Sequence, residues 1–183
     1  MPISQSHAEN LMQMLEAAED CLRARRHIPA LVLLYSLVDS LAWAGANRSN
    51  PDLRTRFEHW VSRWLMPHLP PASPRITATD LYAARCAILH TGTGVSDLSK
   101  SGKAKRLMYA WGNAKTEVLE YAIAHSRIGG EHAALHYDAL LVAVRLGAAD
   151  FFASATSDPE LASRIEEVAS FQYTNVPSDP GAA

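Results

Sequence analysis

The sequence predicts an all-α protein, an antiparallel bundle of about five to seven helices. Apolar side chains recur at spacings of three and four residues along most of the chain, as they do on one face of a helix. Proline and glycine residues fall between these segments, where helices end. Neither the alternation of a half-buried strand nor an internal repeat stands out, so we expect a single helical domain over residues 1–170.

The first two helices are predicted from different patterns. Residues 5–26 carry one apolar stripe opposite acidic side chains, which indicates an amphipathic helix. Pro29 suits the first position of a second helix that is apolar around almost its whole circumference, as a central helix would be. Asp39 is the exception on this helix. It either caps or bonds within the core, or it pairs with Arg85 and orients it.

Capping and helix-breaking residues delimit the next two helices. A third helix is expected from residue 51 or 52 to 66, and the prolines between 67 and 74 then form a stiff connection inside the domain. Thr77 and Asp80 approximate a capping box at the start of the fourth helix. Gly92 is suited to end that helix.

The C-terminal part begins with a long polar loop that reaches about residue 101. Helical spacing predicts a fifth helix over 102–126, a sixth over about 131–153 and a short seventh over about 158–170. The tail 171–183 contains prolines and glycine, and we expect it to be disordered at its end.

Composition limits the partners and the compartment that we expect. The chain has 183 residues and a formal net charge of −2, so any polyanion would have to be held by a local basic patch. The two cysteines, Cys21 and Cys86, lie in apolar helical patterns, which favours free thiols in a reducing compartment. No signal peptide is visible, and polar residues interrupt the longest apolar run. We expect a cytoplasmic protein with no membrane span and no cofactor.

Two polar residues on the fourth helix suggest phosphodiester chemistry. Arg85 is a permanent cation whose planar fork of donors fits phosphate oxygens. His90 titrates near neutrality and can transfer protons. The spacing alone carries little, because Arg63 with His68 and Arg127 with His132 repeat it. Both of those pairs cross a proline or glycine helix end, whereas Arg85 and His90 share one helix beside a polar glycine loop.

Around this pair the sequence resembles the HEPN family, the higher eukaryote and prokaryote nucleotide-binding helical domains. Many members carry a run like Leu-Tyr-x-x-Arg-Asn-x-Ile-x-His-Gly late in a helical bundle, and Leu81, Tyr82, Arg85, Ile88 and His90 fall in place here. Two positions depart from the run: Cys86 stands where asparagine or another polar residue is common, and Thr91 separates His90 from its glycine.

The resemblance implies a metal-independent endoribonuclease, often a toxin or antiviral effector, that works as a homodimer with a composite site. RNA, and an antitoxin or regulatory protein, are the partners it implies. His90 would act as a base on the ribose 2′-OH or as an acid on the leaving oxygen, and Arg85 would stabilise the phosphate charge. On a straight helix the two side chains point about 140° apart. Either the last turn unwinds, or a second subunit completes the site.

Supporting roles and one alternative function complete the hypothesis. Thr91 and Thr93 could bond phosphate from the loop. A non-catalytic helical adaptor that binds a partner protein or nucleotide is the alternative, and Cys86 favours it. His132 and His136 have the spacing of metal ligands, but no third ligand is evident, so we expect no metal. The basic cluster that could guide the strand consists of Lys100, Lys103, Lys105 and Arg106.

Overall fold

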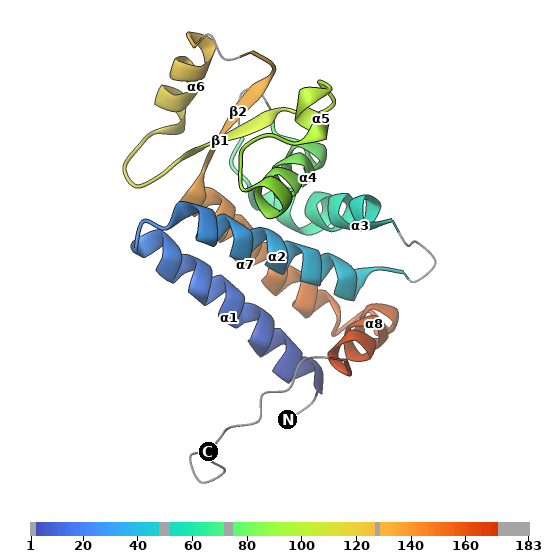
Figure 1. Cartoon of the computed structure of the whole chain (residues 1–183). Coiled ribbons are helices and arrows are strands. Elements are labelled where there is room, and N and C mark those ends of the chain that lie inside the picture. The colour runs from blue at the N-terminus through green and yellow to red at the C-terminus, as the bar shows by residue number, and fades with distance from the viewer. Residues whose placement is uncertain (1–2, 48–51, 72–74, 127–128, 172–183) are drawn as a thin grey trace.

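The computed structural model describes residues 3–47, 52–71, 75–126 and 129–171, and over these ranges it confirms the predominantly helical class. Eight α-helices and one two-stranded parallel sheet make up this part of the chain (Figure 1). The α-helices are α1 (Ile3–Arg23), α2 (His27–Gly45), α3 (Leu53–Trp60), α4 (Ala78–Cys86), α5 (Asp97–Lys100), α6 (Thr116–Ala124), α7 (Tyr137–Ser154) and α8 (Pro159–Ala169). The strands are β1 (Arg106–Ala110) and β2 (His132–His136), and short turns η1 (Val61–Leu65), η2 (Met66–His68) and η3 (Ala87–Thr91) extend α3 and α4.

The central helix is α2, as its apolar circumference predicts. It contacts α1, α3, α7 and α8, and Leu34, Leu37 and Leu41 are almost fully buried. It begins at His27, so Pro29 lies inside the first turn, where the missing N–H costs no helical bond. Among the described residues α2 is also the one single helix long and apolar enough to cross a bilayer, but a core helix passes the same test.

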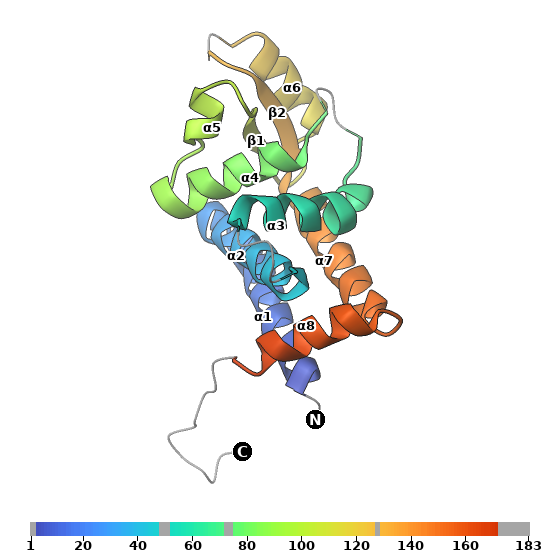
Figure 2. The same ribbon diagram turned by 90° about the vertical axis from the view of Figure 1, so that its right-hand side faces the viewer.

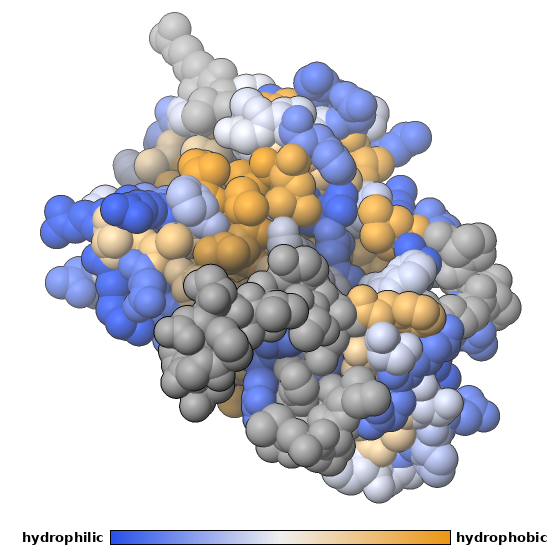
Figure 3. All heavy atoms as spheres, turned by 60° about the horizontal axis from the view of Figure 1, so that its bottom comes forward, coloured by the Kyte–Doolittle hydropathy of each residue, from blue (hydrophilic) through white to orange (hydrophobic). Residues whose placement is uncertain are grey.

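Five other helices surround α2 in different directions. Helices α1 and α7 run alongside it, α3 and α4 pass across, and α8 packs at the end where α1 begins (Figures 1 and 2). Figure 3 views the molecule from that end, where hydrophobic surface interrupts the hydrophilic shell. Close backbone contact joins α7 to η1, because a Cβ at Gly147 would lie 2.6 Å from the carbonyl oxygen of Trp64.

The two strands overturn part of the helix prediction. The predicted helix at 102–126 is wrong over residues 102–115, because α6 begins only at Thr116, and the helix predicted from about 131 begins only at Tyr137. Within these stretches Arg106 to Ala110 pair in parallel with His132 to His136. Parallel strands need a crossover connection, and α6 provides it. A short apolar run fits a helix or a buried strand equally well by periodicity. Gly112, at φ +61°, marks the turn after β1 that the helical interpretation overlooked.

Capping contacts define several helix ends, among them the predicted ends at Thr77 and Gly92. Thr77 and Asp80 form the reciprocal capping box, and Asp158 caps α8 by accepting from the Leu161 N–H at 3.0 Å. Gly92 adopts the left-handed conformation at the end of η3, with φ 62°. The predicted tail 171–183 lies outside the described residues, apart from Phe171.

Candidate functional site

Of the two roles that the sequence left open for Asp39, the structure shows the pairing with Arg85. Asp39 projects from α2 and Arg85 from α4, and the Nε and Nη2 atoms of Arg85 donate to Asp39 Oδ2 at 2.8 and 2.6 Å. The Arg85 side chain is 8% exposed and the Asp39 side chain 19%. A guanidinium this deeply placed needs a counter-charge. The carboxylate of Asp39 meets that need and fixes the direction of the fork.

His90 meets the third nitrogen of the same guanidinium. Its Nε2 lies 3.0 Å from Arg85 Nη1 within one chain. The expected offset of about 140° assumed a straight α-helix, and η3 is a π-helical turn instead. The i→i+5 bonding of a π turn aligns residues five apart. The last turn therefore widens, and geometry alone no longer requires a second subunit to bring the pair together.

The contact assigns a role to each of its two nitrogens. A guanidinium nitrogen can only donate, so Arg85 Nη1 is the donor and His90 Nε2 the acceptor. His90 is exposed, whereas Arg85 is buried. The pair thus combines an exposed histidine with a buried guanidinium that contacts its Nε2.

Electrostatics around the pair come from three neighbours. Burial acts to lower the pKa of Arg85, but the hydrogen bonds and charge of Asp39 outweigh it, so the pKa is raised. Burial, assisted by a hydrogen bond and charge interaction with Cys86, raises the pKa of Tyr82 to about 12. The Tyr82 ring lies 6.0 Å from the Arg85 guanidinium carbon and stacks edge-on against Phe57. Arg85 is consequently held by a carboxylate on one side and an aromatic ring on another.

The remaining predicted site residues of the fourth helix lie next to the pair. Cys86 is a free thiol whose sulfur is 3.9 Å from Arg85 Nη1. Thr91 donates to the Ala87 carbonyl at 2.7 Å and meets the Thr93 hydroxyl at 2.7 Å. Both hydroxyls thus bond within the helix end and loop, although both residues are exposed at the same rim as His90.

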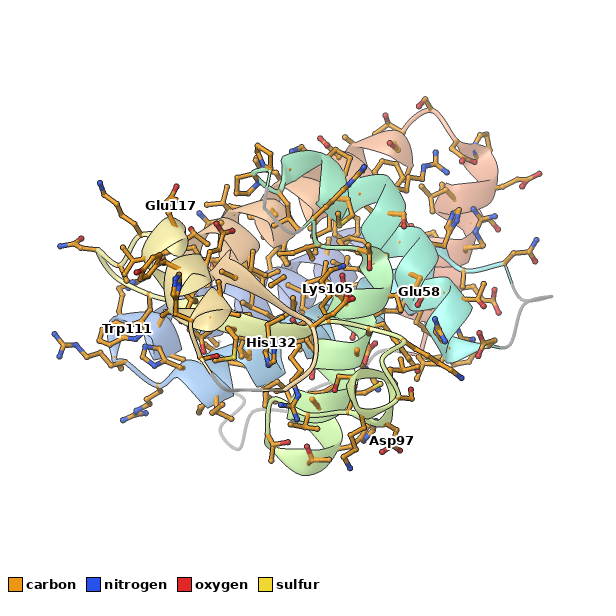
Figure 4. The ribbon with its side chains drawn as sticks, turned by 90° about the horizontal axis from the view of Figure 1, so that it is seen from above. Glu58, Asp97, Lys105, Trp111, Glu117 and His132 are labelled. Carbon is orange, nitrogen blue, oxygen red and sulfur yellow. The ribbon has the colours of Figure 1, made fainter. Side chains whose placement is uncertain are left out.

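The basic cluster is divided by the fold. Lys105 donates through its backbone N–H and its Nζ to Asp80, which is 2% exposed, at 2.7 and 3.5 Å. Figure 4 places Lys105 beside α4 and Asp97 at the outer edge of the view, on α5. Lys100 pairs loosely with Asp97 at 3.6 Å, while Lys103 is exposed. Lys105 therefore ties β1 to α4, and a structural role accounts for it.

The sequence did not predict two features of the site, the placement of the Tyr82 ring and the surroundings of the second Asp39 oxygen. Tyr82 was part of the family-like run, but its place between Arg85 and Arg54, 5.9 Å from the latter, depends on the packing of α3 against α4. The second oxygen of Asp39, Oδ1, is buried and accepts no hydrogen bond from the described residues. A buried carboxylate oxygen usually has a donor, so this atom can accept one from another molecule.

Arg63 and His68, the first of the other two Arg-x4-His pairs, do not form a comparable site. His68 bonds Asp150 at 2.7 Å, and Arg63 lies over the Trp64 ring. Arg127 is outside the described residues, and His132 bonds the Gly130 carbonyl. Over the described ranges no three His, Cys, Asp or Glu residues are grouped as metal ligands.

Comparison with known proteins adds no assignment: no family model, no curated protein and no solved structure matches the chain. The resemblance to HEPN domains therefore stays a prediction based on the residues of the fourth helix.

Proposed function

We propose that the protein is a HEPN-like, metal-independent endoribonuclease that cleaves RNA by attack of the ribose 2′-OH on the adjacent phosphate. The observation that carries the proposal is the chain of contacts from Asp39 through Arg85 to an exposed His90. A cation that can hold phosphate and a base that can take a proton lie 3.0 Å apart, with His90 exposed and Arg85 buried behind it. This is the minimum that the reaction requires of a protein.

The proposed reaction starts when an RNA phosphate displaces His90 from Arg85 Nη1. Arg85 then binds the phosphate oxygen, and the freed Nε2 accepts the proton of the 2′-OH. The 2′-oxygen bonds phosphorus, and the bond to the 5′-oxygen breaks. The products are a 2′,3′-cyclic phosphate and a 5′-OH, whose proton comes from a general acid. Asp39 keeps the guanidinium aimed as charge develops on the phosphate.

A homodimer fits the need for both an acid and a base. One chain supplies one His90. The reaction, however, removes a proton from the 2′-OH and delivers a proton to the 5′-oxygen. Two chains with their pairs facing each other would supply both histidines. Toxin or antiviral activity, an antitoxin or regulatory protein as partner, and a cytoplasmic location follow from the resemblance and belong to the same proposal.

The burial of Arg85 favours a second candidate function. Arg85 is 7% exposed and three of its nitrogens have partners, as in a purely structural ion pair. On this interpretation the protein is a non-catalytic helical adaptor that binds a partner protein or nucleotide.

Cleavage of labelled RNA in EDTA distinguishes the two functions. We expect cleavage by the wild-type protein, with cyclic phosphate ends, and a loss of at least about 100-fold in His90→Ala. Arg85→Lys keeps the charge but loses the fork, so it should also lose activity. His125→Ala replaces another exposed histidine, at the end of α6, and should cleave normally. Equal background cleavage by the wild type and His90→Ala would establish the adaptor instead.

A further inference from the structure

A pocket separate from the Arg85–His90 site lies between the C-terminal end of α2, the α3–η1 segment and α8. Its volume is about 340 Å³, within the range of small-molecule sites, and it shares no lining residue with the site described above. Its walls include Trp60, Trp64 and Phe151, and Phe151 meets both indole rings edge-on at centroid distances of 6.2 and 6.0 Å. The aromatic walls suit a flat apolar group.

The pocket concentrates positive charge in a protein whose net charge is −2. Arg56, Arg63 and Arg164 line it, and Asp158 is the acidic residue among its lining. The Asp158 carboxylate already caps α8. Arg164 has an ion pair with Glu160, but this is long, at 3.7 Å, and the Glu160 side chain is 90% exposed. Such a surface pair neutralises little of the charge inside the pocket.

Three donor groups of the lining residues have no acceptor among the residues that the structure describes. The indole Nε1 of Trp60 and the Nε atoms of Arg56 and Arg164 are buried and bond to none of the described residues. Trp60 is only 2% exposed, so its N–H is withdrawn from bulk water. Buried donors normally have partners. Three such donors on the residues of one cationic pocket indicate an acceptor supplied by another molecule.

The aromatic rings already hold two of these cations in place. The Arg56 guanidinium lies over the Trp43 ring and the Arg63 guanidinium over the Trp64 ring, each 4.5 Å from the ring centroid. Stacking restricts the side chains without using their N–H donors. Arg56 and Arg63 are thus ordered before a ligand binds, which lowers the entropy cost of binding.

We propose that this pocket binds a small organic anion, a flat aromatic group that carries a carboxylate or phosphate. The anion would accept hydrogen bonds from Arg56, Arg164 and the Trp60 N–H, while the ring packs between the aromatic walls. Binding here is independent of the proposed ribonuclease activity.

Titration of tryptophan fluorescence and calorimetry with four probes test the proposal. Phenyl phosphate and benzoate combine a ring with an anion, inorganic phosphate has only the anion, and phenol has only the ring. We expect phenyl phosphate or benzoate to bind at least about 10-fold more tightly than phosphate and phenol, because each of these lacks one set of contacts. The tighter of the two aromatic anions then identifies the preferred group.

Two pocket arginines and a neighbouring arginine outside the pocket provide a matched comparison. Arg56→Gln and Arg164→Gln should each weaken binding about 10-fold, since a hydrogen bond to a charged group is lost. Arg54→Gln removes a neighbouring arginine of α3 that does not line the pocket and should bind like the wild type. Circular dichroism melting confirms that each variant folds.

Three results would overturn the proposal. They are the absence of millimolar or tighter binding by either aromatic anion, equal affinity for phenol and phenyl phosphate, and equal weakening by Arg54→Gln and Arg56→Gln. None of them bears on RNA cleavage by His90, so the two proposals fail separately.

Discussion

At the scale of single residues, the site depends on how the N–H donors of Arg85 are shared between Asp39 and His90. Arg85 gives two hydrogen bonds to one oxygen of Asp39 and directs a third nitrogen to His90. The ion pair fixes the plane of the fork, so His90 receives a donor in a defined direction. The same residues therefore contribute to the stability of the α2–α4 contact and to the proposed chemistry.

Removal of the Asp39 carboxylate should destabilise the fold. Asp39→Ala leaves the Arg85 charge buried without its counter-ion, and we expect a loss of about 3 kcal/mol in the free energy of unfolding. Urea denaturation followed by circular dichroism measures it. Asp20→Ala breaks an exposed pair with Arg23 and should cost no more than about 0.5 kcal/mol. Equal losses in the two variants would contradict a structural role for the Asp39–Arg85 pair.

The hydroxyl pair of Tyr35 and Tyr109 should make the fold sensitive to alkali. Their oxygens lie 2.6 Å apart, and burial raises the pKa of both groups. Above about pH 10 unfolded tyrosines release their protons while the folded pair keeps them, so stability falls as pH rises. Melting temperatures between pH 8 and pH 11 should decline less steeply in the Tyr35→Phe/Tyr109→Phe variant. Tyr121→Phe, an exposed control at 66%, should keep the wild-type slope.

At the scale of elements, the π turn η3 decides where His90 lies. It follows directly on α4 and ends at the left-handed Gly92. Such turns insert into helices that sequence patterns predict as regular, and they are frequent at functional sites. We predicted that either an irregular last turn or a second subunit must bring Arg85 and His90 together. The irregular last turn does so within one chain.

Contact between η1 and α7 should be disrupted by a single methyl group. At an exposed position inside a helix, Gly→Ala raises the free energy of unfolding by about 1 kcal/mol. At Gly147, however, a Cβ would lie 2.6 Å from the Trp64 carbonyl oxygen. We expect Gly147→Ala to lower the free energy of unfolding by about 1–3 kcal/mol, since neighbouring backbone must move. Gly129→Ala meets nothing within 4 Å and should have little effect. A stabilised Gly147→Ala protein would contradict the close approach.

At the scale of the whole molecule, α2 joins the two ends of the chain in one core. It packs against α1 from the N-terminal part and against α7 and α8 from the C-terminal part. The site and the cationic pocket lie along this same helix, which contributes Asp39 to one and Ala42 and Gly45 to the other. Their separation along one rigid element lets each be tested by its own variants.

Mixed dimers test whether the proposed ribonuclease site needs two chains. Wild-type and His90→Ala proteins unfolded together in equal amounts and refolded should give random dimers. If one site needs both histidines, only wild-type pairs are active, and about one quarter of the activity should remain. Activity of about one half would mean that each chain works alone. Sedimentation equilibrium checks that the mixture is dimeric.

The sequence by itself determined the helical class, the helix ends at Thr77 and Gly92 and the central position of α2, and it offered pairing with Arg85 as one of two roles for Asp39. Each follows from local periodicity, from local hydrogen-bonding chemistry or from the cost of a buried charge. Only the tertiary structure decided the strands, the contact between Arg85 and His90, the loss of Lys105 to Asp80 and the grouping of arginines from α3, η1 and α8. Apart from the π turn, these features are contacts between segments far apart in the chain, and local sequence patterns do not predict such contacts. The π turn is a change of one residue in helical bonding, too small for the apolar spacing to show.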